Sequence, residues 1–175
     1  MSLFARIRDG DCAGALALVR SGAAVDVNER GTDGPPPADG GATCLLAAIR
    51  SFAPGDLELV QELLNRGADA NLADTQEQET PIQAAARFHA YETAFIDALL
   101  AKGADPERTN KHGDTALHVA ASAGAAISAA HLVKRGANYK TKDRKGKTAI
   151  EIAQDVACKS SIQEAIDGLG GKQQQ

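Results

Sequence analysis

The stretch "TALHVAA" at residues 115–121 decides the fold, because variants of it recur along the chain. The other copies read "TCLLAAI" at 43–49, "TPIQAAA" at 80–86 and "TAIEIAQ" at 148–154. Their threonines follow one another at intervals of 37, 35 and 33 residues. A nearly constant interval of this size predicts a repeat protein rather than a single irregular core.

A second motif, Gly-Ala, recurs in step with the first. It lies in "RSGAAVD" at 20–26, "NRGADAN" at 65–71, "AKGADPE" at 101–107 and "KRGANYK" at 134–140. Two large apolar residues precede each copy, and the glycine can end a helix because it adopts the left-handed conformation without steric cost. Each repeat therefore contains a helix that ends at this glycine.

The threonine of the first motif marks the start of another helix. Its hydroxyl can accept a hydrogen bond from a free backbone N–H at the helix N-terminus. Pro81 follows one of these threonines and suits the first helical position. The alanines that come next leave one helix face thin, so a neighbouring helix can approach closely. Each unit is predicted to be helix, turn, helix and a projecting loop.

This pattern resembles the ankyrin repeat, whose signature T-P-L-H-x-A recurs about every 33 residues. The match is best in "GDTALHVAASAG" and "LVKRGAN" of the fourth unit and extends over about residues 2–168. The resemblance implies an all-α repeat solenoid of ankyrin-type helix-turn-helix units joined by β-hairpin or finger loops. We expect a small stand-alone protein with one domain at 1–168 and a disordered tail at 169–175.

The predicted domain contains five units. They are an N-terminal cap at 2–26 that lacks the threonine motif, units at 43–74, 80–109 and 115–141, and a C-terminal cap at 148–168.

An insertion, "VNERGTDGPPPADGGA" at 27–42, separates the first two units. Its prolines, glycines and aspartates predict an extended or disordered segment. Two interpretations stay open: a tolerated surface insertion, or a flap beside the binding groove.

The turns between the two helices are longer in units two and three. The extra residues lie in "RSFAPGD" and "RFHAYET", which contain Phe52, Phe88 and Tyr91. Aromatic side chains anchor protein interfaces, but these three could equally fold back and fill the enlarged turns.

Charge is segregated along the chain. Acidic residues dominate 56–79, and basic residues dominate 140–147. The two segments could orient a partner, or they could be solvated surface.

Composition argues against several classes of function. A net charge of −4 gives no general reason to bind nucleic acid. The three cysteines are far apart and form no CxxC pair, so neither a zinc site nor a disulfide framework is indicated. No signal peptide or long apolar segment is present, so we expect a soluble cytoplasmic protein, monomeric on its own.

His112, Asp114 and His118 could be the raw material of an acid–base or metal site. The four histidines occupy different phases of the repeat, however, and no catalytic or phosphate-binding motif occurs. We therefore expect no enzyme, no metal and no cofactor. In the ankyrin family the histidine in the place of His118 bonds to the cap threonine, so the resemblance implies a structural role for it.

The resemblance also implies protein binding on a concave face, formed by the finger loops and the ends of the first helices. We expect a protein partner there, with no role for a membrane and none for nucleic acid. The candidate binding residues are Arg50, Phe52, Gln76, Glu77, Arg87, Phe88, Tyr91, Lys111, His112, Asp114, Ser122, Arg144, Lys145 and Lys147. The alternative is an inhibitory or regulatory subunit of an enzyme that uses loop 27–42 as a flap.

Overall fold

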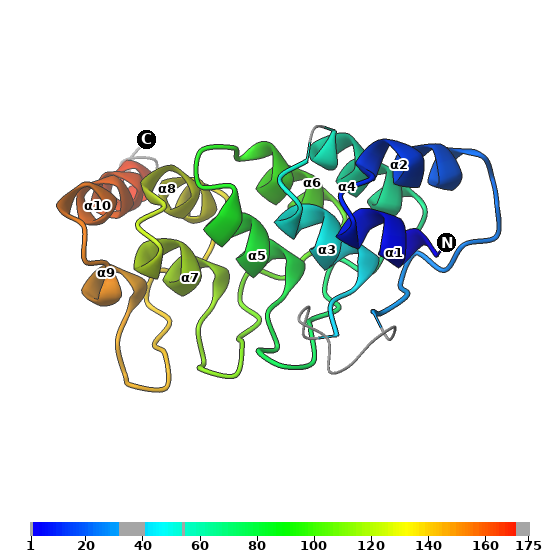
Figure 1. Cartoon of the computed structure of the whole chain (residues 1–175). Helices are drawn as coiled ribbons and strands as arrows, with labels where there is room; N and C mark the ends of the chain where they lie inside the picture. Colours follow the sequence, from blue (N-terminus) through cyan, green and yellow to red (C-terminus); the bar gives the residue numbers. More distant parts are fainter. Residues whose placement is uncertain (1, 32–40, 54, 171–175) are drawn as a thin grey trace.

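A computed structural model describes residues 2–31, 41–53 and 55–170, and it shows a row of paired helices (Figure 1). The first helices of the pairs lie side by side in one layer, the second helices lie in a layer behind it, and long loops project from the first layer. Within the described ranges the chain forms helices and isolated β-bridges but no strand. The all-α repeat solenoid is confirmed, and its fingers are loops rather than paired strands.

Each predicted unit contains one pair of helices. The pairs are α1 (Leu3–Arg8) with α2 (Cys12–Arg20), α3 (Cys44–Arg50) with α4 (Asp56–Asn65), α5 (Pro81–Phe88) with α6 (Ala94–Ala101), α7 (Ala116–Ser122) with α8 (Ala126–Lys134), and α9 (Ala149–Ile152) with α10 (Val156–Gly170). Helices α3, α5, α7 and α9 pack in sequence, and α8 packs on α10. Helix α10 extends to Gly170, and residues 171–175, which make up most of the predicted tail, lie outside the described ranges.

The recurring threonines begin the first helices, as the sequence predicts. Thr43 Oγ1 accepts the N–H of Leu46 at 3.3 Å. In the later units the residue three positions on reaches back to the threonine N–H, through a side-chain oxygen of Gln83 or Glu151 or a ring nitrogen of His118. The first unit lacks threonine here, but Ser2 takes its place and accepts the N–H of Ala5 at 3.2 Å.

Small side chains let the first helices pack closely. Ala84, Ala85, Ala120 and Ala121 are fully buried in α5 and α7, two helices that pack against each other. The layer behind supplies larger residues, among them Leu59 and Leu99, which are also fully buried. The core is therefore built from alanine and branched aliphatic residues, in agreement with the low aromatic content.

Polar side chains fix each unit to the next at the loops that follow the second helices. The Asn71 amide donates to the Gly103 carbonyl and its oxygen accepts the Asp105 N–H, both at 2.8 Å. Asn28 makes the same pair of bonds to the unit after it. Glu107 replaces asparagine in the next unit and also accepts bonds from the following loop. These bonds set the register between units.

Candidate functional site on the concave face

Three fingers are described in full: the second (74–79), the third (110–114) and the fourth (143–147). Each begins with Asp or Asn, namely Asp74, Asn110 and Asp143. Its side-chain oxygen accepts two backbone N–H groups across the finger, at 2.8–3.2 Å. The side chain thus ties the loop to itself, beside a backbone hydrogen bond that joins the two ends of each finger. The sequence analysis did not single out these three residues, although each lies five or six positions before a cap threonine.

A hollow of about 330 Å³ lies between the second and third fingers and the helices beside them. We call it the central hollow. The predicted residues that line it are Arg50, Gln76, Glu77, Arg87, Phe88, His112 and Asp114. The sequence analysis missed Asp74, Glu79 and Asn110, which line it as well. Half of the predicted set, from α3, α5 and two fingers, thus meets in one place.

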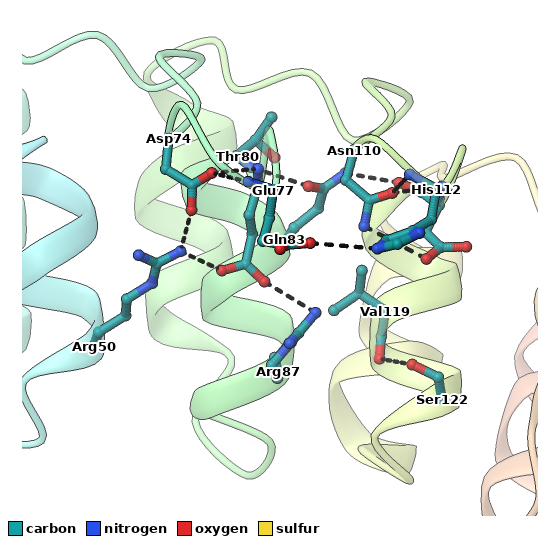
Figure 2. Close-up of polar contacts among 12 residues, drawn as sticks. Arg50, Asp74, Glu77, Thr80, Gln83, Arg87, Asn110, His112, Val119 and Ser122 are labelled. Atoms are coloured by element: carbon teal, nitrogen blue, oxygen red, sulfur yellow. Dashed lines mark hydrogen bonds and ion pairs between the residues drawn. The ribbon is translucent and has the colours of Figure 1, made fainter. Parts of the chain in front are cut away.

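A network of charges forms one side of the central hollow (Figure 2). Arg50 pairs with Asp74 at 2.7 Å and with Glu79 at 2.6 Å, and Arg87 reaches Glu79 at 3.1 Å. The two carboxylates are almost buried, with side chains 3% and 6% exposed. Buried charges are tolerated only when paired and hydrogen-bonded, so this network holds the second finger against α3 and α5.

Burial alone would lower the pKa of Arg50, but its bonds to Asp74 and Glu79 outweigh this effect and the pKa is raised. The guanidinium therefore stays charged.

The network also bears on the acidic segment 56–79, which could form a charged surface for a partner. Its acidic side chains do not form one acidic surface, because Asp74 and Glu79 face two arginines.

The tips of the second and third fingers are linked by charge. Glu77 pairs with the Lys111 ammonium and lies 3.3 Å from His112 Nε2. The hydrogen bond from Lys111 is the main reason that the pKa of Glu77 is lowered. Asp114 lies at the other end of the third finger, where its carbonyl accepts the Asn110 N–H at 3.1 Å. Lys111 and His112 thus bind a neighbouring finger while remaining partly exposed.

The three aromatic residues of the long turns differ in position. Phe88 is half-buried and packs against the core, whereas Tyr91 is 87% exposed. Phe52 is 61% exposed, and its ring meets Phe88 edge-on with centroids 5.8 Å apart. Of the two interpretations left open, folding back applies to Phe88, while Phe52 and Tyr91 lie at the surface.

His118 belongs to the scaffold, as the resemblance implies. Its Nδ1 lies 2.8 Å from Thr115 Oγ1, and its Nε2 lies 3.1 Å from the Lys147 carbonyl in the fourth finger. Gln83 has the same role in the preceding unit and donates to two carbonyls of the third finger region. His118 is buried, whereas His112 is exposed at a finger tip, so they do not form a common site.

A second hollow of about 630 Å³ lies beside the fourth finger. We call it the C-terminal hollow. The predicted residues Asp114, Ser122, Lys145 and Lys147 line it. Of the remaining predicted residues, Arg144 donates its N–H to the His112 carbonyl, and Phe52, Tyr91 and Lys111 line neither hollow. In residues 2–31, 41–53 and 55–170, no group of three or more His, Cys, Asp or Glu is placed to hold a metal ion.

Comparison with known proteins agrees with this architecture. The family described as ankyrin repeats (3 copies) matches residues 45–143 and 83–164. The chain belongs to the ankyrin-repeat family. Ankyrin repeats are in general protein–protein interaction modules, and ankyrin-repeat domains are typically non-catalytic. No helix of this ankyrin-repeat chain, within the residues that the structure describes, is long and apolar enough to cross a membrane.

Two similar proteins are much longer than this chain. The E3 ubiquitin-protein ligase KEG of Arabidopsis thaliana is 33% identical over 131 residues, which cover 74% of this chain and 8% of that protein. The 2-5A-dependent ribonuclease of Mus musculus is 38% identical over 72 residues, covering 41% of this chain and 10% of that protein. The chain thus matches a tenth or less of either relative.

Proposed function

We propose that this ankyrin-repeat chain is a non-catalytic module that binds a partner protein on its concave face, centred on the central hollow. The proposal rests on one observation: α3, α5 and two fingers surround a single hollow. Phe88, Arg87 and His112 line this hollow and are partly exposed. Aromatic and arginine side chains in a recess are the common anchors of protein interfaces.

The central hollow is also held in a fixed shape before any partner arrives. Ion pairs join Arg50 and Arg87 to the base of the second finger, and Glu77 joins the second finger to the third. A preorganised surface loses less entropy when it binds. These charges are already matched within the chain, which favours a protein partner of mixed chemistry over a nucleic acid.

The first test is to purify the partner by affinity from the native host and identify it by mass spectrometry.

We expect Phe88→Ala with Arg87→Ala to weaken binding of that partner by about tenfold or more, since anchor residues contribute at least 1 kcal/mol each. Ile127→Ala is the control, because Ile127 is 49% exposed in α8, away from the fingers. Unchanged affinity in the Phe88 variant, with its fold intact by circular dichroism, would refute binding at the central hollow.

A second candidate function is inhibition or regulation of an enzyme through the insertion at 27–42. One observation favours it: Arg30 donates to the Gly41 carbonyl at 2.6 Å and to the Ala73 carbonyl at 2.9 Å. The two ends of the insertion are thus fixed beside the second finger, while residues 32–40 lie outside the described ranges. Deleting 32–40 should abolish inhibition of an identified enzyme partner, whereas a simple scaffold should keep its affinity.

A further inference from the structure

The C-terminal hollow exists because the first helix of the last unit is short. Helix α9 has 4 residues, whereas α7 has 7. It ends at Ala153, whose backbone is extended with ψ 123°, and Asp155 then accepts the N–H of Ala157 at the start of α10. The missing helical turn leaves the concave face recessed, with Ile152 and Ala153 in the lining.

Three lysines surround this recess. Lys145 and Lys147 come from the fourth finger, and Lys159 comes from α10. All three are exposed, and within the described ranges none of their ammonium groups takes part in an ion pair or hydrogen bond. The central hollow differs in this respect, because Arg50 and Arg87 are each paired there with a carboxylate.

Two acidic residues of the same recess are already engaged by the backbone. Asp143 accepts the N–H groups of Lys145 and Lys147 at 2.8 and 2.9 Å. Glu151 accepts the N–H and hydroxyl of Thr148 at 2.7 and 2.9 Å. The backbone thus holds both carboxylates in place, and although they lie near Lys145 and Lys147, neither forms a direct ion pair with a lysine of the recess.

We infer that the C-terminal hollow binds an acidic segment of the partner protein, with Asp or Glu side chains pairing with Lys145, Lys147 and Lys159. This inference rests on the proposed function and adds the chemistry of the partner at one end of the concave face. A protein segment fits better than a nucleic acid. Asp114 lies in the same lining and Glu77 lines the next hollow, so an unbroken row of phosphates would meet carboxylates, whereas spaced acidic side chains avoid them.

The test uses the full chain and a fluorescein-labelled peptide of alternating Glu and Ser, about eight residues or roughly 25 Å long when extended. Anisotropy is measured at low salt, with a Lys-Ser peptide and an oligo-dT of equal charge as comparison probes. We expect the Glu-Ser peptide to bind, and Lys145→Glu with Lys159→Glu to weaken it by roughly tenfold or more. Added salt should weaken it as well.

The matched control is Lys102→Glu with Lys134→Glu, which changes the net charge equally. Lys102 and Lys134 are exposed at the ends of α6 and α8, outside both hollows. An equal loss in the two variants, or tighter binding of oligo-dT than of the peptide, would overturn the inference. Amide shifts in the wild-type chain give a second readout that needs no variant: peptide-induced shifts at 143–154 and near Lys159 support the acidic segment, and shifts confined to residues outside the C-terminal hollow refute it.

The partner itself separates this inference from the proposed function. If the Phe88/Arg87 variant loses the partner and the Lys145/Lys159 variant keeps full affinity, binding at the central hollow is supported. The inference that an acidic segment binds the C-terminal hollow is then refuted. If both variants keep full affinity, the proposed concave face fails. Loss in both, with Lys102→Glu/Lys134→Glu unchanged, supports the two together.

Discussion

Gln78 adopts a backbone conformation that glycine holds in the other fingers. It has φ 54°, and it lies two residues before Thr80. Gly41, Gly113 and Gly146 occupy the same place before their threonines, with φ 66°, 82° and 76°. A residue with a Cβ atom loses about 1–2 kcal/mol in this region, so the second finger carries a cost that the others avoid.

The first prediction concerns Gln78→Gly. We expect the free energy of unfolding to rise by about 1 kcal/mol, because the strain disappears. Glycine also makes the unfolded chain more flexible, which reduces the stabilisation in part. Urea denaturation measures it. Gly146→Ala is the mirror variant: a Cβ atom there would meet nothing within 4 Å, so its expected loss of similar size is conformational. A less stable Gln78→Gly chain would show that the glutamine side chain supports the finger.

Interactions within a few residues were predictable from sequence, and long-range ones were not. The pair Thr115–His118 spans three positions of a known motif, so its role could be inferred from the motif alone. The bonds of Arg50 to Asp74 and Glu79 join residues 24 and 29 positions apart. No motif marks them, and they depend on how two units stack.

At the scale of helices and turns, too, some features could be predicted from the sequence and others could not. The long turns after α3 and α5 follow from counting residues, and both are observed. The short length of α9 could not be predicted from the sequence, since "TAIEIAQ" resembles the motifs that begin the longer first helices. It ends early because Ala153 turns the chain into an extended conformation and Asp155 starts a new helix.

Acid should weaken the last unit through the start of α9. Bonds from the Thr148 N–H, followed by the Thr148 hydroxyl, lower the pKa of Glu151 from its ordinary value of 4.5. A carboxyl group whose pKa is lower in the folded state stabilises the fold above its unfolded pKa and loses that contribution as the pH falls through the folded value. The loss should therefore begin below about pH 5 and continue downward.

The second prediction is that Glu151→Gln reduces this acid dependence. Glutamine can accept the same cap bond, as Gln83 does with Thr80, but it does not titrate. Thermal melts from about pH 6 to about pH 3 should show a smaller drop in Tm for the variant than for the wild type. The control is Glu164→Gln, at an exposed site in α10 outside any cap. It should leave the slope of Tm against pH near that of the wild type. Equal slopes for Glu151→Gln and the wild type would contradict the assignment.

The stacking of units limits how far a local defect spreads. Helix α10 packs on α8 and α9, whereas α5 packs between α3 and α7, and α6 packs on α4 and contacts α8 through Asp97 and His131. In such arrays each repeat is stabilised by its own contacts and by those with its neighbours. A defect in α10 therefore removes support from one end of the described array and leaves the rest paired.

The third prediction compares Ile162→Ala in α10 with Leu99→Ala in α6, two fully buried sites. Each change should cost about 2–5 kcal/mol through lost packing and a cavity. Hydrogen exchange should then differ: Ile162→Ala should speed exchange in residues 149–170 and spare α3 to α6, while Leu99→Ala should speed it on both sides of α6. Loss of protection to the same extent along the whole chain in both variants would mean that the units unfold as one.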